Sequence, residues 1–247
     1  NWAEGDWRGA DRLMGLYKKE SMQVKCPRCG DVAKMSPDHI GPVSLGFRHQ
    51  MHFQPMCIDC NSSKNNRMTL KDVKLLVTLE SSGTRVVSWH SEAIWAAFKP
   101  LINDDSGAMR ASGLMRRNLH HVLSMLSVLY KAGFEDFLTE FLHPEYAAFD
   151  FEFQEFNPST GKFKATRFAA NNANTRKQAA RYLRISFESL EAYSEKDNRK
   201  SKMWESPDSD VILDQVLSDL YNGDKPAARR GMLRILEVLA GQAAREF

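Results

Sequence analysis

The sequence predicts an α+β fold that is mainly helical, with a β-hairpin in the C-terminal part of the chain. Two observations lead to this prediction. Apolar residues recur every three or four positions in most segments, as they do on the buried face of a helix. Residues 148–156 instead alternate between apolar and polar side chains, turn at residues 157–161, and return over residues 162–168, which is typical of a hairpin.

The composition is that of a globular protein. Of the 247 residues, 43% are hydrophobic and 26% are charged, which excludes collagen-like, low-complexity and broadly disordered classes. No apolar run approaches the roughly 18 residues of a membrane helix, and no signal peptide is visible. We therefore expect a cytoplasmic protein without membrane contact. The net charge of +3 is the surplus of residues 1–70, which carry 10 lysines and arginines against 7 acids.

The N-terminal elements are expected in the order helix, strand, loop, strand, helix. The first helix is predicted over residues 8–20. Residues 32–39 are expected to form a short strand, and Pro37 favours an edge position for it. Glycines and a proline mark a loop over residues 41–46. Apolar residues at helical spacing predict one continuous helix over residues 61–80.

Basic residues are expected to share one face of that last helix. They fall at i, i+3, i+7 and i+10, which places them on one side of a continuous helix. This basic stripe consists of Lys64, Arg67, Lys71 and Lys74.

The middle of the chain is expected to be helical. Helices are predicted over residues 91–98, 114–131 and 134–142. A polar loop over residues 103–107 separates the first two of these helices, and we place a domain boundary there. The two predicted domains are residues 1–102 and residues 103–247.

Further helices are expected after the hairpin. One is predicted over residues 174–195 and a second over residues 207–221. A last helix is capped by Asp224, with Pro226 near its first turn. On the first of these helices, basic side chains lie away from the apolar face: Lys177, Arg181 and Arg184.

The four cysteines form two C-x2-C pairs. Cys26 and Cys29 form the first pair, and Cys57 and Cys60 the second. Two such pairs deliver four thiolates to one point, which is the ligand set of a structural zinc site. The alternatives are two disulfides or four free thiols, and the absence of secretory features makes disulfides the weaker reading.

The segments beside these pairs carry a further motif. Residues 38–46 read DHIGPVSLG, and residues 52–64 read HFQPMCIDCNSSK. They resemble the HNH nucleases, the ββα-metal class, whose pattern is D-H-x-x-P-x-S followed by N-L-Q-P-L-C-x-x-C-N-x-x-K. The resemblance covers residues 26 to about 70. It implies a zinc-stapled ββα-metal core and cleavage of nucleic acid with a divalent cation.

The resemblance also implies roles for individual residues. His39 would be the general base that takes a proton from water. Asp38 and Asn61 would hold a catalytic Mg²⁺ or Mn²⁺, while zinc on the four cysteines would be structural. Lys64 would touch the scissile or an adjacent phosphate. These residue types suit phosphodiester hydrolysis, which needs a base near neutral pKa and a hard cation on oxygen ligands.

One position departs from the family pattern. His52 stands where the family has the Asn that orients the base, so the orienting role of this imidazole is open. His49 is a candidate for a phosphate contact, against the alternative of an exposed loop histidine. Asn65 is a rival or additional metal ligand, since it follows Asn61 by four positions on the predicted helix, against the alternative of a surface residue.

The overall pattern is most similar to type II restriction endonucleases of the HNH kind, including the type IIS subgroup. It implies a double-stranded DNA substrate, and a homodimer is one way to cut both strands. DNA phosphates would be contacted by Lys64, Arg67, Lys177, Arg181 and Arg184. A start at Asn1 without methionine fits the cleavage half of a longer enzyme. The alternatives are a homing or other HNH nuclease of phage or mobile elements, an RNA substrate, and a zinc-ribbon module that binds DNA without cutting it.

Overall fold

The computed structural model describes all of the chain except residues 1, 20–23, 143–148, 170–171 and 195–204. The described part is mostly helical and contains two small antiparallel sheets, so the α+β prediction holds at this level. The elements are, in order, α1 (Trp7–Lys19), β1 (Met35–His39), η1 (Val43–Leu45), β2 (Phe53–Cys57), α2 (Ile58–Lys64), α3 (Leu70–Ser81), η2 (Trp89–Ser91), α4 (Glu92–Phe98), α5 (Asp105–Lys131), α6 (Glu135–Thr139), β3 (Phe149–Asn157), β4 (Lys162–Ala169), α7 (Asn172–Ser194), α9 (Pro207–Tyr221) and α10 (Lys225–Glu246).

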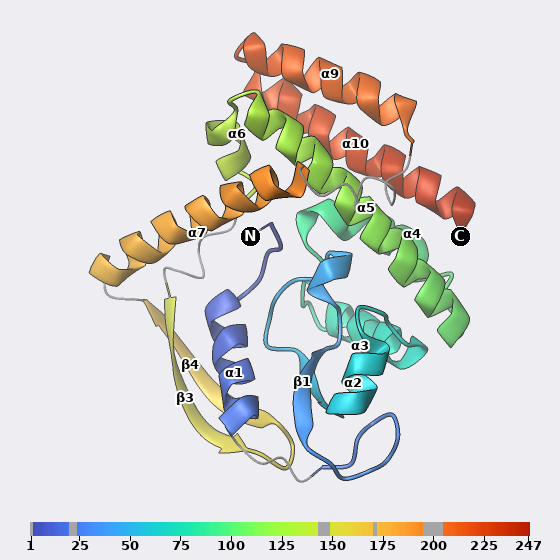
Figure 1. The fold of residues 1–247 in the computed structure, drawn as a ribbon, viewed down its shortest axis with the longest axis vertical. Coiled ribbons are helices and arrows are strands. Elements are labelled where there is room, and N and C mark those ends of the chain that lie inside the picture. The colour runs from blue at the N-terminus through green and yellow to red at the C-terminus, as the bar shows by residue number, and fades with distance from the viewer. Residues whose placement is uncertain (1, 20–23, 143–148, 170–171, 195–204) are drawn as a thin grey trace.

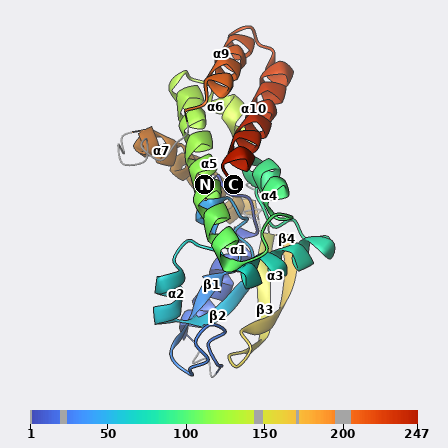
Figure 2. The same ribbon diagram turned by 90° about the vertical axis from the view of Figure 1, so that its right-hand side faces the viewer.

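The two sheets lie at one end of the molecule, and a group of helices lies at the other. Figures 1 and 2 show β1, β2, α2 and the β3–β4 hairpin at one end, and α5, α6, α9 and α10 at the other. The helix α1 lies between the two sheets and packs against both β1 and β3. None of the described helices combines the length and the apolar content needed to cross a membrane.

One apolar core joins the two ends. Leu45 and Phe47, which precede β2, belong to the same buried cluster as Trp95 of α4 and Met232 and Ile235 of α10. A smaller cluster around Leu13, Tyr17 and Met56 packs α1 against the β1–β2 sheet. The smaller cluster therefore fixes α1 beside the strand that carries Asp38 and His39.

The long helix α5 corrects the predicted loop at residues 103–107. The Asp104 carboxylate accepts a hydrogen bond from the Gly107 N–H at 2.6 Å, and the helix begins at Asp105 rather than at Leu114. An N-cap of this kind satisfies one of the free N–H groups of the first turn. α4 packs on α10, so one apolar core contains residues from both sides of residue 102. The division of the chain into two domains at that residue stays a prediction.

The predicted single helix over residues 61–80 is wrong. α2 ends at Lys64, because Asn65 adopts φ 51°, a conformation that no α-helix contains. α3 begins after Thr69, whose hydroxyl accepts from the Asp72 N–H while the Asp72 carboxylate accepts from the Thr69 N–H. The predicted basic stripe is therefore divided between two helices and the turn between them.

The other predicted elements are found, with shifted ends. The first strand begins at Met35, because Val32 makes only an isolated bridge with Lys25. β3 and β4 pair antiparallel as predicted, with Phe153 opposite Ala165 and a register shift between Gln154 and Asn157. The predicted ends at residues 20, 148 and 195 lie outside the described residues. Helices were predicted within a few residues of α1, α4, α6, α7, α9 and α10.

Candidate active site and metal centre

The candidate site lies on a strand, loop, strand and helix. β1 pairs with β2 so that Asp38 lies opposite Gln54 and His39 opposite Phe53. α2 follows β2 without an intervening loop and packs against both strands. The sheet thereby presents the last two residues of β1 close to the side chains of a helix.

The four cysteines form one cluster. Their sulfur atoms all lie within 4.8 Å of one another, and none is in a disulfide. The Sγ atoms of Cys29 and Cys57 are 3.8 Å apart, which matches the separation of about 3.8 Å that tetrahedral Zn–S bonds of 2.3 Å require. A disulfide would need about 2.05 Å. The donor set therefore fits a structural zinc ion.

Local backbone geometry brings each pair together. The Gly30 N–H donates to the Cys26 carbonyl at 2.9 Å, closing a turn in which Gly30 has φ 81°, a region that glycine enters without steric cost. In the second pair, Cys57 is the N-cap of α2, and its Sγ accepts from the Cys60 N–H at 3.4 Å. The two knuckles are thus formed by a glycine turn and by a helix start.

Asp38 lies in a buried network of charges. The residue is 4% exposed, and its Oδ2 accepts from the Lys64 ammonium at 2.5 Å and from the Gln54 amide at 2.8 Å. Lys64, 3% exposed, is also 3.2 Å from Oδ2 of Asp72, whose Oδ1 accepts from Gln54 at 2.7 Å. Burial raises the pKa of Asp38, and the attraction of Lys64 opposes that rise.

Lys64 therefore does not lie on a basic surface in this structure. Its ammonium is shared between two carboxylates and also donates to the His39 carbonyl at 3.2 Å. A buried charge needs partners of this kind, because the low-dielectric interior otherwise destabilises it. The predicted phosphate contact would require Lys64 to leave both carboxylates.

His39 makes its closest polar contact with His49. Its Nε2 lies 2.9 Å from Nδ1 of His49, and Nε2 of His49 lies 3.1 Å from Oδ1 of Asp11. The His39 ring also packs against Phe53, with ring centroids 4.7 Å apart. Burial, followed by the neighbouring His49 and Lys64, lowers the pKa of His39 to about 4. The imidazole is therefore neutral at pH 7 and able to accept a proton, although the lowered pKa makes it a weaker base than a free imidazole.

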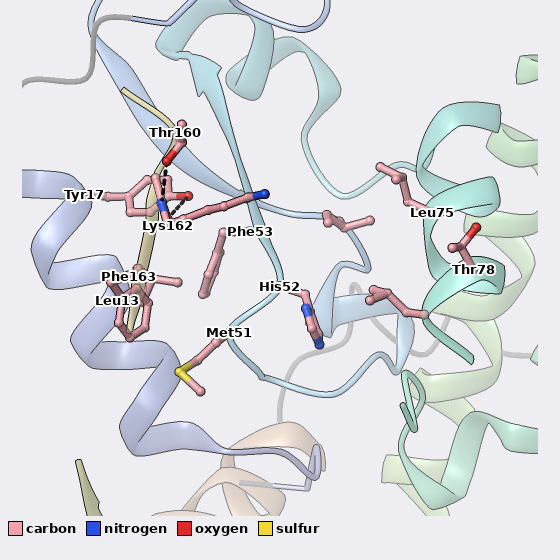
Figure 3. A pocket seen from close by; sticks show the side chains of 13 residues that line it. Leu13, Tyr17, Met51, His52, Phe53, Leu75, Thr78, Thr160, Lys162 and Phe163 are labelled. Atoms are coloured by element: carbon pink, nitrogen blue, oxygen red, sulfur yellow. Dashed lines mark hydrogen bonds between the residues drawn. The ribbon is translucent and has the colours of Figure 1, made fainter. Parts of the chain in front are cut away.

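The His52 side chain lies in a pocket and not against the His39 ring. It lines a pocket of about 560 Å³ between α1, β2, α3 and the tip of the hairpin. Figure 3 shows its imidazole between Met51 and Phe53 on one side and Leu75 and Thr78 of α3 on the other. Burial lowers the pKa of His52. In this structure, His49 rather than His52 reaches the ring of His39.

The two asparagines differ in position. The Asn61 amide nitrogen donates to the Ser36 hydroxyl at 2.8 Å and to the Pro37 carbonyl at 3.5 Å, beside the backbone that leads into Asp38. Asn65 is exposed and is the C-cap of α2, where its positive φ takes it off the helix. The expectation that Asn65 continues the same helical face as Asn61 is therefore wrong.

The remaining predicted DNA contacts are exposed. The Arg67 guanidinium donates to the carbonyls of Ser63 and Lys64 at the end of α2. Lys177, Arg181 and Arg184 lie on α7, which Figures 1 and 2 show well apart from α2. Arg184 is 3.5 Å from Glu188 one turn on. The structure therefore separates the candidate site from the basic face of α7.

Sequence reasoning assigned no role to Asp11, Gln54 or Asp72. Gln54 was part of the recognised motif, and the T-x-x-D spacing of Thr69 and Asp72 is a helix-cap signal. No local pattern marks Asp11, because its partner His49 is 38 residues away in the chain.

The chain matches the model of a known protein family. A family model described as "Type II restriction endonuclease (RE_Alw26IDE)" matches residues 1–232. No curated protein and no solved structure matches the chain. The match includes every residue of the candidate site and the whole of the hairpin.

Proposed function

Since the chain belongs to the type II restriction endonuclease family described as RE_Alw26IDE, whose members cleave DNA with divalent metals, we propose that it cuts DNA by an HNH mechanism. The observation that carries this proposal is the placement of Asp38, His39 and Asn61 on one strand, loop, strand and helix unit. His39 is a neutral imidazole that directly follows the buried carboxylate of Asp38 in the chain, and these two residue types suit the hydrolysis of a phosphodiester.

The donor atoms of the site suit a hard cation. The hydrogen bonds from Lys64 and Gln54 end on Oδ2 of Asp38, so Oδ1 is the oxygen that would bind a metal. The Asn61 amide nitrogen is turned to Ser36, so its carbonyl oxygen is the group that would serve as the second ligand. Mg²⁺ or Mn²⁺, when bound, stabilises charge on the phosphoryl and leaving oxygens.

The chain's own residues supply the remaining chemistry. His39 accepts the proton of the attacking water, and Phe53 limits the rotation of the His39 ring. Gln54 and Lys64 hold the Asp38 carboxylate in one orientation. Zinc on the four cysteines would join the turn that precedes β1 to the start of α2, and so keep the two halves of the site together.

The rest of the chain is proposed to hold the DNA. The exposed basic residues of α7 would neutralise phosphates, which predicts that DNA affinity falls as salt rises. Pairing of two chains would bring two sites to the two strands. The family match favours a restriction enzyme over a homing nuclease, and the base and metal ligands favour cleavage over DNA binding alone.

Plasmid cleavage tests this proposal. We expect the purified protein to linearise or nick plasmid DNA with Mg²⁺ or Mn²⁺, and His39→Ala to lower the rate by about 10²–10⁴-fold. Circular dichroism and zinc content serve as controls for folding of the variant. Normal cutting by folded His39→Ala would remove His39 as the base. Run-off sequencing should give fixed ends, whereas scattered ends would contradict a sequence-specific enzyme.

A further inference from the structure

We propose that His49 and Asp11 are positioning residues that fix the orientation and the tautomer of His39. The inference rests on the proposed function, because it concerns the same general base. It assigns to His49, and not to His52, the task of orienting that base. It also gives α1, which lies outside the recognised motif, a part in the chemistry.

The three side chains form a chain of hydrogen bonds from three separate segments. Asp11 is on α1, His49 lies in the loop before β2, and His39 ends β1. The contacts are 3.1 Å from Asp11 Oδ1 to His49 Nε2, and 2.9 Å from His49 Nδ1 to His39 Nε2. Both distances are those of well-formed hydrogen bonds.

The direction of these bonds follows from the chemistry of the groups. An ionised carboxylate only accepts hydrogen bonds, so Asp11 requires the proton of neutral His49 to be on Nε2. Nδ1 of His49 is then an acceptor, which requires the proton of neutral His39 to be on its own Nε2. The lone pair of His39 is thereby placed on Nδ1, the nitrogen that would accept the proton of water. This is the logic by which a carboxylate selects a histidine tautomer in other hydrolases.

The surroundings of His49 hold its ring in place. His49 is 4% exposed, its ring centroid lies 4.3 Å from that of Trp7, and its backbone N–H donates to the Glu4 carbonyl at 2.9 Å. A Cβ at Gly5 would lie only 2.0 Å from the His49 carbonyl oxygen, so the two backbones meet where only glycine fits. The N-terminal segment thus packs directly on the loop that carries His49.

The two positioning residues should differ in importance. His49 is buried and touches the base directly, whereas the Asp11 side chain is 68% exposed, so water screens its charge. We therefore expect the loss of His49 to slow the reaction more than the loss of Asp11. Both effects should fall on kcat, because the His49 ring is buried against Trp7 and the Asp11 carboxylate is an anion, which a phosphate would repel.

The test compares variants of the full, zinc-loaded chain in steady-state cleavage of one plasmid with Mg²⁺. His49→Ala should lower kcat by about 10²-fold with KM changed by less than about twofold. His49→Asn should recover much of this loss, because its Oδ1 can stand where Nδ1 of His49 stands and accept from His39. Asp11→Asn should lower kcat by about tenfold in the wild-type background and have no effect in His49→Asn, where no imidazole remains to orient. Asp214→Asn, the same change on an exposed acid of α9, is the matched control.

A spectroscopic measurement separates this inference from the proposed function. Long-range ¹H–¹⁵N spectra of histidine-labelled protein should show His39 with its proton on Nε2, and a mixture of tautomers in His49→Ala. An unchanged His39 tautomer in that variant, or an unchanged kcat, overturns the inference. If His39→Ala cuts normally, the proposed mechanism fails, while the tautomer result still decides whether His49 fixes His39.

Discussion

The Lys64 ammonium lies between two buried carboxylates, Asp38 and Asp72, and this position decides what it can do. The family resemblance implied a phosphate contact for Lys64, which is a role for an exposed cation. The burial of Lys64 could not be predicted from the motif. Asp72 lies outside the motif, and it comes close to Lys64 because the chain turns at Asn65 and α3 begins after the Thr69 cap. At the scale of the residue, the motif pointed to Asp38 and Lys64, whereas their ion pair and the third partner, Asp72, are visible only in the structure.

We therefore expect the removal of Lys64 to lower the stability of the folded protein. Lys64→Met leaves two buried carboxylates without their cation, and we expect the free energy of unfolding to fall by about 3–5 kcal/mol. Lys71→Met, an exposed lysine on α3, should change it by less than about 0.5 kcal/mol. Urea titrations of both variants measure this difference. A Lys64→Met protein as stable as wild type, but weaker in DNA binding, would favour the phosphate role.

At the scale of the element, α1 connects the candidate site to the hairpin. Asp11 contacts His49, and about two turns later the Tyr17 hydroxyl donates to the Gly161 carbonyl at the hairpin turn, 3.2 Å away. Helical periodicity predicted α1, and alternation predicted the hairpin. Neither pattern carries information about which elements pack together, so the contact of α1 with both sheets could not be predicted.

The contact at Tyr17 predicts a pH dependence in alkali. Burial raises the pKa of Tyr17 from 10.0 to about 12, so the folded state keeps its proton where the unfolded state loses it. The stabilisation is complete below pH 10 and is lost between pH 10 and 12, by up to about 3 kcal/mol. The free energy of unfolding should fall more steeply between pH 10 and 12 for wild type than for Tyr17→Phe, which lacks the ionisable group. Equal slopes would mean that Tyr17 is solvated in the folded protein.

At the scale of the whole molecule, the sequence predicted the fold class and most elements, and missed how they are joined. The loop that carries His49 is fixed by residues far away: the Arg48 N–H donates to the Val86 carbonyl, and the Ser88 N–H to the Gly46 carbonyl. These long-range bonds bring His49 to His39 and leave His52 in the pocket. No local sequence pattern encodes these bonds. The sequence alone therefore could not show which histidine lies against His39.

Zinc should hold the smaller end of the molecule together. The β1–β2 sheet has two strands of five residues each, and such a sheet is marginal without further support. We expect one zinc per chain by metal analysis, and its removal by a chelator to lower Tm by on the order of 10 °C, with recovery when zinc is added back. A metal-free protein with its thiols oxidised in pairs would contradict the site.

The close approach of Gly5 to His49 also has a consequence for inheritance. Residue 5 lies far outside the recognised motif, yet any side chain there would displace the loop that reaches the proposed base. Among descendants of this chain, a change at position 5 is expected to be lost by selection unless position 49 changes with it. Relatives that keep the DH motif but differ at both positions would therefore mark a lineage that orients its base in another way.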